Sequence, residues 1–282
     1  MKLFYVLGGG LGHLTRVKRL ISTLGIESDF LIFSTAWATK VFPSDQCIII
    51  DTEVVNDKGK LFDYLLHQLI KHAVTDLYID TFPLGLFKEI DFNLIPKQCR
   101  THYIARYLKW NTYIQKSSFQ NVKFDTSYII DFMNQEQFRF IKSNSNTVHH
   151  YQLKPSKVKA GQQNQEQKYY LINHSGSQEE VLQLLELLKK HPGYKQSNLP
   201  ILINSPKDFS GVIADNVEMI HQYPAHSLFD QAKLIVTGCG YNSMIETLPF
   251  FEKHIFTPFE RKFDNQFERA KRRNDFVLSN TR

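Results

Sequence analysis

Short apolar runs alternate with amphipathic helical segments along this chain, and the alternation occurs twice. The first series consists of apolar runs at 3–7, 30–33, 48–50 and 77–79 and an amphipathic segment at 62–74. The second series, which starts near Lys168, consists of apolar runs at 169–172, 201–203 and 234–236 and a leucine-rich segment at 179–190. Strands that alternate with helices predict parallel sheets, whose ligands bind at the carboxyl ends of the strands.

A linker is predicted between the two series. Residues 154–167 include Pro155 and Gly161, are rich in glutamine and show no apolar periodicity. We therefore expect an α/β fold of two doubly wound, Rossmann-like domains, residues 1–153 and 168–282, that face each other across a cleft.

Composition narrows the class of protein without naming a partner. The net charge of +6 is compatible with nucleic acid, with an anionic membrane surface, or with solubility alone. Three cysteines, Cys47, Cys99 and Cys239, are too few and too scattered for a disulfide framework. No apolar run approaches the roughly 20 residues of a membrane span, and the sequence starts with a strand pattern instead of a secretory leader. We expect a cytoplasmic protein.

The first apolar run is followed by a glycine-rich turn, Gly8 to His13. Glycines at 8, 9, 10 and 12 allow the backbone to approach a ligand closely. The turn is not a dinucleotide fingerprint, because His13 stands where that motif needs a small residue. Two interpretations of His13 stay open: a general base, for which its ordinary pKa of about 6.5 is suitable, or a group that caps the helix or binds phosphate.

Asp80 directly follows the apolar run at 77–79 and should lie at the carboxyl end of that strand. It could orient His13, act as the base itself, or close the turn that Pro83 and Gly85 shape. The pattern favours the last, structural role.

The segment 237–246 indicates an anion site. The apolar run at 234–236 ends at Gly238, and Gly240 precedes a predicted helix that has Asn242 and Ser243 in its first turn. A helix start favours anions, because its amides point outward and its dipole is positive there. Glu246 lies one turn further on, within reach of a ribose diol. The combination predicts a nucleotide-sugar site.

These residues resemble the donor-binding half of the GT-B glycosyltransferases, especially the lipid-linked N-acetylglucosaminyl transferase of peptidoglycan synthesis. The resemblance implies that 168–282 is the donor domain and 1–153 the acceptor-side domain. It further implies a diphosphate at Gly240, Asn242 and Ser243, a ribose at Glu246, and donor-sugar hydroxyls at Asp264, Asn265 and Gln266. The chain departs from the family at Glu252-Lys253-His254, where relatives have Gly-x-Pro.

Weaker parts of the resemblance concern three other segments. The turn with Gly9, Gly10, Gly12 and His13, extended to Arg16, is similar to an acceptor-side turn of GT-B enzymes. His174 and Ser175 stand where the family places a first phosphate-approaching turn, although Ser177 is explained equally well as a helix cap with Glu180 three residues on. Residues near Ile220 and Tyr223, before a helix predicted at 228–231, would read a uracil or form a surface loop.

No metal or cofactor is expected. The sequence has no Asp-x-Asp for a divalent ion on a diphosphate and no zinc-type spacing of histidine and cysteine. Main-chain amides at 240–243, with Arg261 or Lys262, would then stabilise the leaving group.

Cations and aromatic residues interleave at 100–110. This pattern suits an anionic membrane face, a lipid-linked acceptor or single-stranded nucleic acid. We favour a strand with one buried face. We also expect the basic residues Arg269 to Arg273 to complement the C-terminus of a helix.

The resulting prediction is a metal-independent, inverting glycosyltransferase that uses a nucleotide-diphosphate sugar, with a UDP-sugar expected, and a glycan or lipid-linked acceptor. It would work in the cytoplasm or at the inner face of the cell membrane and bind no nucleic acid. Two alternatives remain: a nucleotide-sugar epimerase of the same fold, and a non-catalytic subunit that binds a membrane or a partner protein.

Overall fold

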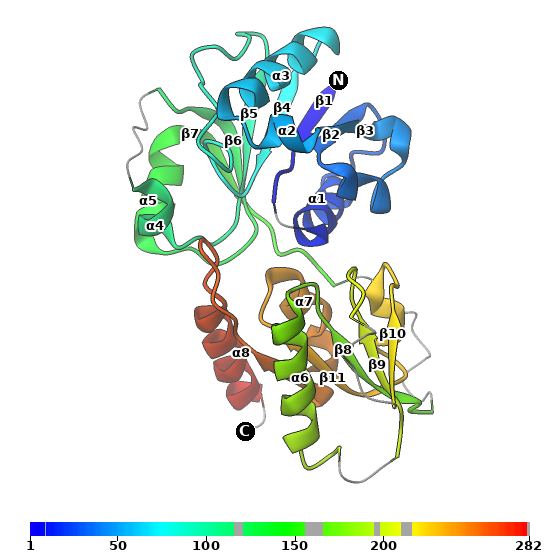
Figure 1. Ribbon diagram of the computed structural model, residues 1–282. Helices are drawn as coiled ribbons and strands as arrows, with labels where there is room; N and C mark the ends of the chain where they lie inside the picture. Colours follow the sequence, from blue (N-terminus) through cyan, green and yellow to red (C-terminus); the bar gives the residue numbers. More distant parts are fainter. Residues whose placement is uncertain (9, 116–120, 156–165, 195–197, 210–215, 281–282) are drawn as a thin grey trace. The chain divides into compact units, whose positions relative to one another are not determined.

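The computed structural model describes the chain except residues 9, 116–120, 156–165, 195–197, 210–215 and 281–282. The chain divides into two compact units. The first contains Met1–Leu153 together with Lys262–Asp264, and the second contains Lys154–Arg261 and Asn265–Arg282. Most of the predicted linker falls on 156–165 and so lies outside the described residues. Each unit is built around its own parallel sheet (Figure 1).

The first sheet has seven parallel strands in the order β3-β2-β1-β4-β5-β6-β7. Their bounds are β1 Lys2–Tyr5, β2 Phe30–Ser34, β3 Cys47–Ile49, β4 Asp76–Asp80, β5 Arg100–Ala105, β6 Phe124–Ile129 and β7 Ser145–His150. The chain winds outward from β1 in one direction and from β4 in the other. A doubly wound sheet binds its ligands where the strand order reverses, which here is between the carboxyl ends of β1 and β4.

The helices of the first unit carry their apolar residues at helical spacing. They are α1 Leu11–Thr23, α2 Thr52–Val55, α3 Lys58–Lys71, α4 Trp110–Ile114 and α5 Gln135–Asn144, with 3₁₀ turns at Ala36–Lys40 and Ser44–Gln46. Leu61, Leu65 and Leu69 of α3 share a core with Leu3 and Leu77 of the sheet. The side chain of Asp57 accepts from two first-turn amides of α3 and so fixes where that helix starts.

The prediction of one buried face for the segment 100–110 is wrong. β5 lies between β4 and β6, and every residue from Thr101 to Arg106 is buried. Strands in the middle of a parallel sheet are covered on both faces. The strand ends at Ala105, and the segment turns into α4 at Trp110 instead of continuing to alternate.

The second sheet has five parallel strands in the order β10-β9-β8-β11-β12. The strands are β8 Tyr169–Asn173, β9 Ile201–Asn204, β10 Val217–Ile220, β11 Ala232–Gly238 and β12 His254–Thr257. The helices are α6 Gln178–Lys190, α7 Tyr241–Glu246 and α8 Gln266–Asn280, with 3₁₀ turns at Ala225–Leu228 and Leu248–Lys253. The strand order reverses between β8 and β11, so the loops after these two strands adjoin.

Two local predictions in this unit have different outcomes. The cap predicted for α6 is confirmed, because the hydroxyl of Ser177 accepts from the amide of Glu180 at 3.4 Å. The helix predicted at 228–231 is wrong. The chain forms a 3₁₀ turn directly after Pro224 instead, and Leu228 and Phe229 join the core beneath it.

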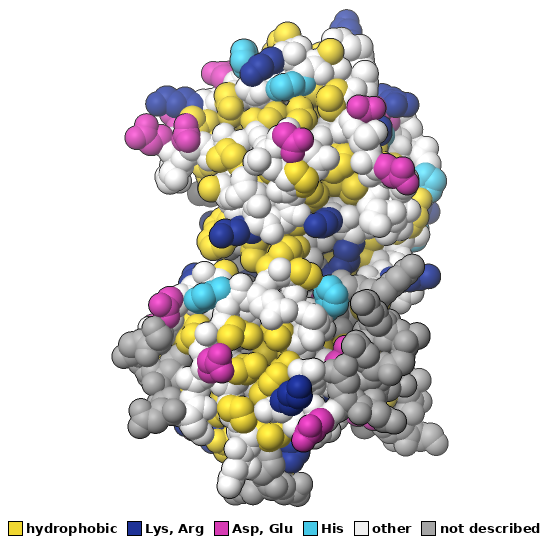
Figure 2. Space-filling view, turned by 90° about the vertical axis from the view of Figure 1, so that its right-hand side faces the viewer, with side chains coloured by type: hydrophobic (Ala, Val, Ile, Leu, Met, Phe, Trp, Pro, Cys, Tyr) yellow, Lys and Arg dark blue, Asp and Glu magenta, His cyan; other side chains and the backbone are white. Residues whose placement is uncertain are grey.

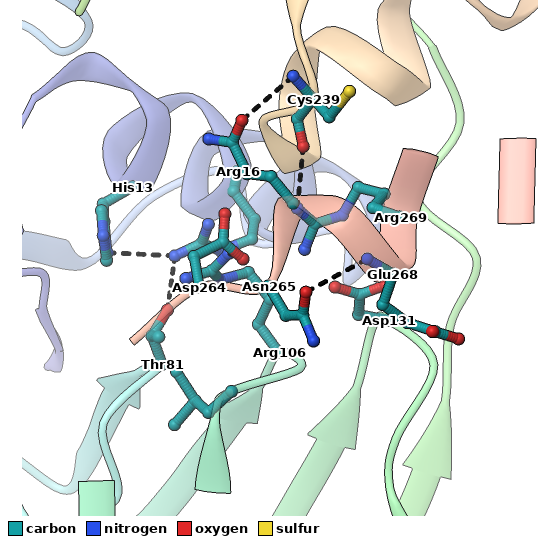
Figure 3. Close-up of polar contacts among 12 residues, drawn as sticks. His13, Arg16, Thr81, Arg106, Asp131, Cys239, Asp264, Asn265, Glu268 and Arg269 are labelled. Atoms are coloured by element: carbon teal, nitrogen blue, oxygen red, sulfur yellow. Dashed lines mark hydrogen bonds and ion pairs between the residues drawn. The ribbon is translucent and has the colours of Figure 1, made fainter. Parts of the chain in front are cut away.

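Helix α8 holds the loop that follows β11. The Oε1 atom of Gln266 accepts from the amides of Cys239 at 3.2 Å and Phe259 at 3.0 Å. Nη1 of Arg269 donates to the carbonyl of Cys239 at 2.9 Å (Figure 3), and Arg273 donates to the carbonyl of Met244. The role predicted for these arginines at a helix C-terminus is therefore wrong: the last turn of α8 has no basic residue. They fasten α8 to the β11–α7 segment.

We expect Gln266→Leu to destabilise the second unit. The substitution keeps the volume of the buried side chain but leaves two buried amides without their acceptor, at a cost of about 1–3 kcal/mol for each. Urea unfolding measures the change. Gln183→Leu makes the same chemical change at an exposed position of α6 and should leave the unfolding midpoint nearly unchanged. Equal midpoints for the two variants would contradict the role assigned to Gln266.

Candidate active site

The reversal point of the first sheet brings together two residues that lie far apart in the sequence. His13 lies in the first turn of α1, directly after β1, and Asp80 is the last residue of β4. Nδ1 of His13 lies 2.7 Å from Oδ2 of Asp80. The half-buried His13 and the buried Asp80 form a histidine–carboxylate pair where a doubly wound sheet binds its ligand.

Asp80 receives more hydrogen bonds than this one. Nε and Nη2 of Arg16 lie 3.1 and 2.6 Å from its two carboxylate oxygens, and the Thr81 hydroxyl donates to Oδ2 at 3.1 Å. The Asp80 side chain is fully buried. Its carboxylate is therefore surrounded by donors from α1 and from its own turn (Figure 3 shows His13, Arg16 and Thr81).

These contacts decide which group can accept a proton. Burial alone would raise the pKa of Asp80, but the charge of Arg16 and the hydrogen bond from His13 outweigh it and lower that pKa to about 2. The carboxylate is ionised at neutral pH and its acceptor positions are occupied. A carboxylate with so low a pKa is a poor proton acceptor. The side chain of Asp80 binds His13 and Arg16, and it also accepts from the Thr81 hydroxyl in the turn that the sequence expected it to close.

The same geometry fixes the tautomer of His13. An ionised carboxylate at 2.7 Å requires a proton on Nδ1, so Nε2 carries the acceptor lone pair. Burial lowers the pKa of His13, and the nearby charge of Arg16 lowers it further. The helix-capping interpretation is wrong, because Gly10 occupies the N-cap of α1 and the imidazole bonds to Asp80.

The backbone next to His13 and Asp80 shapes the site in ways that the sequence did not reveal. A Cβ atom at Gly8 would overlap the His13 ring, so the ring needs a glycine there. Thr81 has a φ of 66°, a left-handed conformation that is strained for a β-branched residue. Of the predicted turn glycines, Gly9 lies outside the described residues, Gly10 has a φ of 153°, and Gly12 is exposed in the first turn of α1.

The predicted donor loop lies at the reversal point of the second sheet. β11 ends at Gly238, and α7 starts after Gly240, which is its N-cap. Asn242 and Ser243 lie in the first turn of α7 and are half-buried. Glu246 is the last residue of α7 and is also half-buried.

A second histidine–carboxylate contact braces the loops of this unit. Nε2 of His174 lies 2.7 Å from Oε2 of Glu180, and Arg261 binds both oxygens of the same carboxylate. A Cβ atom at Gly238 would lie only 2.9 Å from the His174 ring. Arg261, predicted as a cation for the diphosphate, is paired with Glu180, and Ser175 lies exposed beside this cluster.

The three predicted residues at 264–266 make hydrogen bonds with three different parts of the protein. Asp264 belongs to the first unit, where Nη1 of Arg106 donates to it at 2.6 Å. Asn265 accepts from the amide of Glu268 and caps α8, and Gln266 holds the β11–α7 loop. The role of these residues on sugar hydroxyls stays a prediction, although Gln266 is buried and its carbonyl accepts two amide hydrogen bonds within the protein.

Three further predicted positions are placed as follows. Lys262 belongs to the first unit, with its ammonium 4.9 Å from the ring centre of Phe263. Ile220 is the last residue of β10, and Tyr223 follows it in the loop to Pro224; both are half-buried. Among the described residues, no group of three or more histidine, cysteine, aspartate or glutamate side chains is arranged to hold a metal ion.

Comparison with known proteins places the fold. No family model and no curated protein matches the chain. Solved structures match at low sequence identity. The spinosyn forosaminyltransferase SpnP matches with a TM-score of 0.57 and 10% identity, over 97% of this chain and 83% of its own. The glycotransferase of kitacinnamycin matches with a TM-score of 0.61 and 10% identity, over 97% and 83%.

A plant structure, UGT2 of Phytolacca americana complexed with UDP-2fluoro-glucose and pterostilbene, matches with a TM-score of 0.57 and 13% identity, over 95% of this chain and 82% of its own. The chain thus has the α/β fold of two Rossmann-like domains found in GT-B glycosyltransferases, as predicted.

Proposed function

We propose that this protein is a glycosyltransferase that moves a sugar from a nucleotide-diphosphate donor, a UDP-sugar, to a hydroxyl group of an acceptor. The observation that carries the proposal is the His13–Asp80 pair at the reversal point of the first sheet. It supplies a neutral imidazole whose Nδ1 is held by a buried carboxylate and whose Nε2 can take a proton. The GT-B fold of the solved neighbours supports the same reaction class.

In the proposed reaction the acceptor oxygen attacks the anomeric carbon of the donor. Nε2 of His13 takes the hydroxyl proton, the new C–O bond forms, and the bond from carbon to the diphosphate oxygen breaks. The nucleoside diphosphate leaves with the bonding electrons. A direct displacement of this kind inverts the anomeric centre. The imidazolium that forms is stabilised by the adjacent Asp80 carboxylate, as in other histidine–carboxylate pairs.

Residues 168–282, most of which form the second unit, are the proposed donor domain, and residues 1–153 are the proposed acceptor side. The diphosphate would meet the amides that follow Gly240, with Asn242 and Ser243 beside it, and Glu246 would accept hydrogen bonds from the ribose. Two solved neighbours hold such nucleotides: a UGT transferase from Siraitia grosvenorii is in complex with UDP, and the spinosyn rhamnosyltransferase SpnG is complexed with thymidine diphosphate. We assign uridine on the sequence resemblance, and the reaction needs no metal in this proposal.

The acceptor is proposed to be a glycan or a lipid-linked glycan of the cell envelope, reached at the inner membrane face. Its support is the resemblance to the peptidoglycan enzyme. On the face that Figure 2 shows, Lys and Arg side chains lie among Asp, Glu and hydrophobic side chains, so a membrane contact there would be peripheral. Across the described part of the chain, no helix combines the length and the apolar character needed to span a bilayer.

Replacing His13 by Gln should lower kcat by about 100- to 10,000-fold, the usual contribution of a general base. Binding of UDP, measured by calorimetry, should stay within a few-fold of the unmodified protein, because the proposed donor site lies in the second unit. His67→Gln changes an exposed histidine of α3 and serves as the control. A kcat for His13→Gln equal to that of the control would remove His13 from the mechanism.

The pH dependence of kcat/KM follows from the direction of the pKa shift. His13 works only as the neutral base, so activity falls as pH drops through its pKa. Because burial and Arg16 lower that pKa, the acid limb should lie below pH ~6.5, the ordinary pKa of histidine. A pH–rate profile measures it. A half-maximal point above that pH would contradict the described environment of His13.

Glu246→Ala should weaken UDP binding by about tenfold or more, since a hydrogen bond to a charged group contributes about 1.5–3 kcal/mol. Glu186→Ala removes an exposed carboxylate of α6 and should leave affinity unchanged. Unaltered binding after Glu246→Ala would count against the donor site.

Incubation with UDP-sugar alone tests the two alternative functions. A nucleotide-sugar epimerase should produce a new sugar without acceptor, whereas a non-catalytic subunit would convert no donor.

A further inference from the structure

Two nitrogens of the Arg16 guanidinium, Nε and Nη2, contact the residues around the candidate base. Nε contacts Oδ1 of Asp80, and Nη2 lies 2.6 Å from Oδ2, 2.6 Å from the Thr81 hydroxyl and 3.1 Å from Nδ1 of His13. Arg16 is 2% exposed and lies one turn after His13 on the same face of α1. One side chain therefore contacts both members of the histidine–carboxylate pair.

We propose that Arg16 is a positioning residue of the His13–Asp80 pair: its guanidinium fork fixes the carboxylate in the orientation that holds His13 as the Nδ1–H tautomer. The inference rests on the proposed function of His13. Arg16 itself is too deeply buried to meet a substrate.

The geometry assigns each part of the fork a task. Two parallel contacts to the two oxygens of Asp80 determine the plane of the carboxylate, which a single cation cannot do. The contact to the Thr81 hydroxyl also supports the left-handed residue directly after Asp80. Two further hydrogen bonds hold the Thr81 backbone: its amide donates to the carbonyl of Ile104, and its carbonyl accepts from the Tyr103 hydroxyl.

If the buried Arg16–Asp80 ion pair served stability alone, the contacts with His13 would stay unexplained. Such pairs contribute little net stability, because desolvation offsets the attraction. Arg16 and Asp80 would satisfy each other without His13, yet the imidazole shares the same carboxylate oxygen. The charged groups that face His13 are Arg16 from α1, Asp80 from β4 and Arg106 from the end of β5. Of the two cations, Arg16 has the stronger influence on the pKa of His13.

The test compares Arg16→Gln with Arg16→Lys, and uses Lys18→Gln, which removes an exposed cation of the same helix, as the control. Side-chain ¹⁵N NMR of the free protein, with His13 assigned from a His13→Gln spectrum, gives its tautomer and its titration midpoint without any substrate. We expect Nδ1–H in the unmodified protein. Arg16→Gln should raise the midpoint and move the acid limb of the pH–rate profile the same way, whereas Lys18→Gln should move neither.

Arg16→Lys separates charge from geometry. It should keep the titration midpoint near that of the unmodified protein while kcat falls about tenfold to a hundredfold, the usual cost of a misplaced group, with KM for the donor little changed. It also keeps the test decisive where Arg16→Gln fails to fold. An unmoved midpoint in Arg16→Gln, or an unaltered kcat in Arg16→Lys, overturns the inference. If the NMR results hold while no sugar is transferred, the proposed function fails and the role of Arg16 in the pair stands.

Discussion

The arrangement of the first unit depends on keeping one ionised carboxylate in the protein interior. A buried carboxylate needs close partners, because the loss of water costs several kcal/mol. Asp80 finds them in Arg16 and His13, which come from the first two turns of α1. The same contacts therefore fasten α1 to the end of β4 and orient the imidazole. Fold stability and the proton transfer that we propose depend on the same atoms, so a change that affects one should affect the other.

The sequence predicted local features well and sheet neighbours poorly. The strand that ends at Asp80 and the glycine turn before His13 follow from apolar runs and glycines. Which carboxylate meets which histidine depends on β1 lying beside β4, and no local pattern encodes that pairing. For this reason the sequence favoured a turn-closing role for Asp80. Sheet order also explains β5, where alternation predicted one buried face and a central position buries both.

The predicted sugar-binding triplet shows another limit of sequence reasoning. Asp264, Asn265 and Gln266 are consecutive, and a motif treats them as one recognition element. In the structure they meet a buried arginine of the first unit, an amide of α8 and two amides of the second unit. Each of the three side chains thus has a partner within the protein that differs from those of its neighbours in the sequence. A motif match predicts which sequence positions belong to a site, but it does not predict which groups of the protein bond to the polar atoms at those positions.

Both units place a histidine, a carboxylate and an arginine near their first strand–helix turn, and only the first set belongs to the mechanism that we propose. Burial lowers the pKa of His174 as it does that of His13, so pKa does not distinguish them. The exposed fraction of the side chain does. His13 bonds through Nδ1 and leaves Nε2 on a side chain that is 17% exposed. His174 bonds through Nε2, is 8% exposed, and its Nδ1 edge lies against Gly238. His174 is held between Glu180 and the Gly238 backbone, and His13, whose side chain is the more exposed of the two, is the base that we propose.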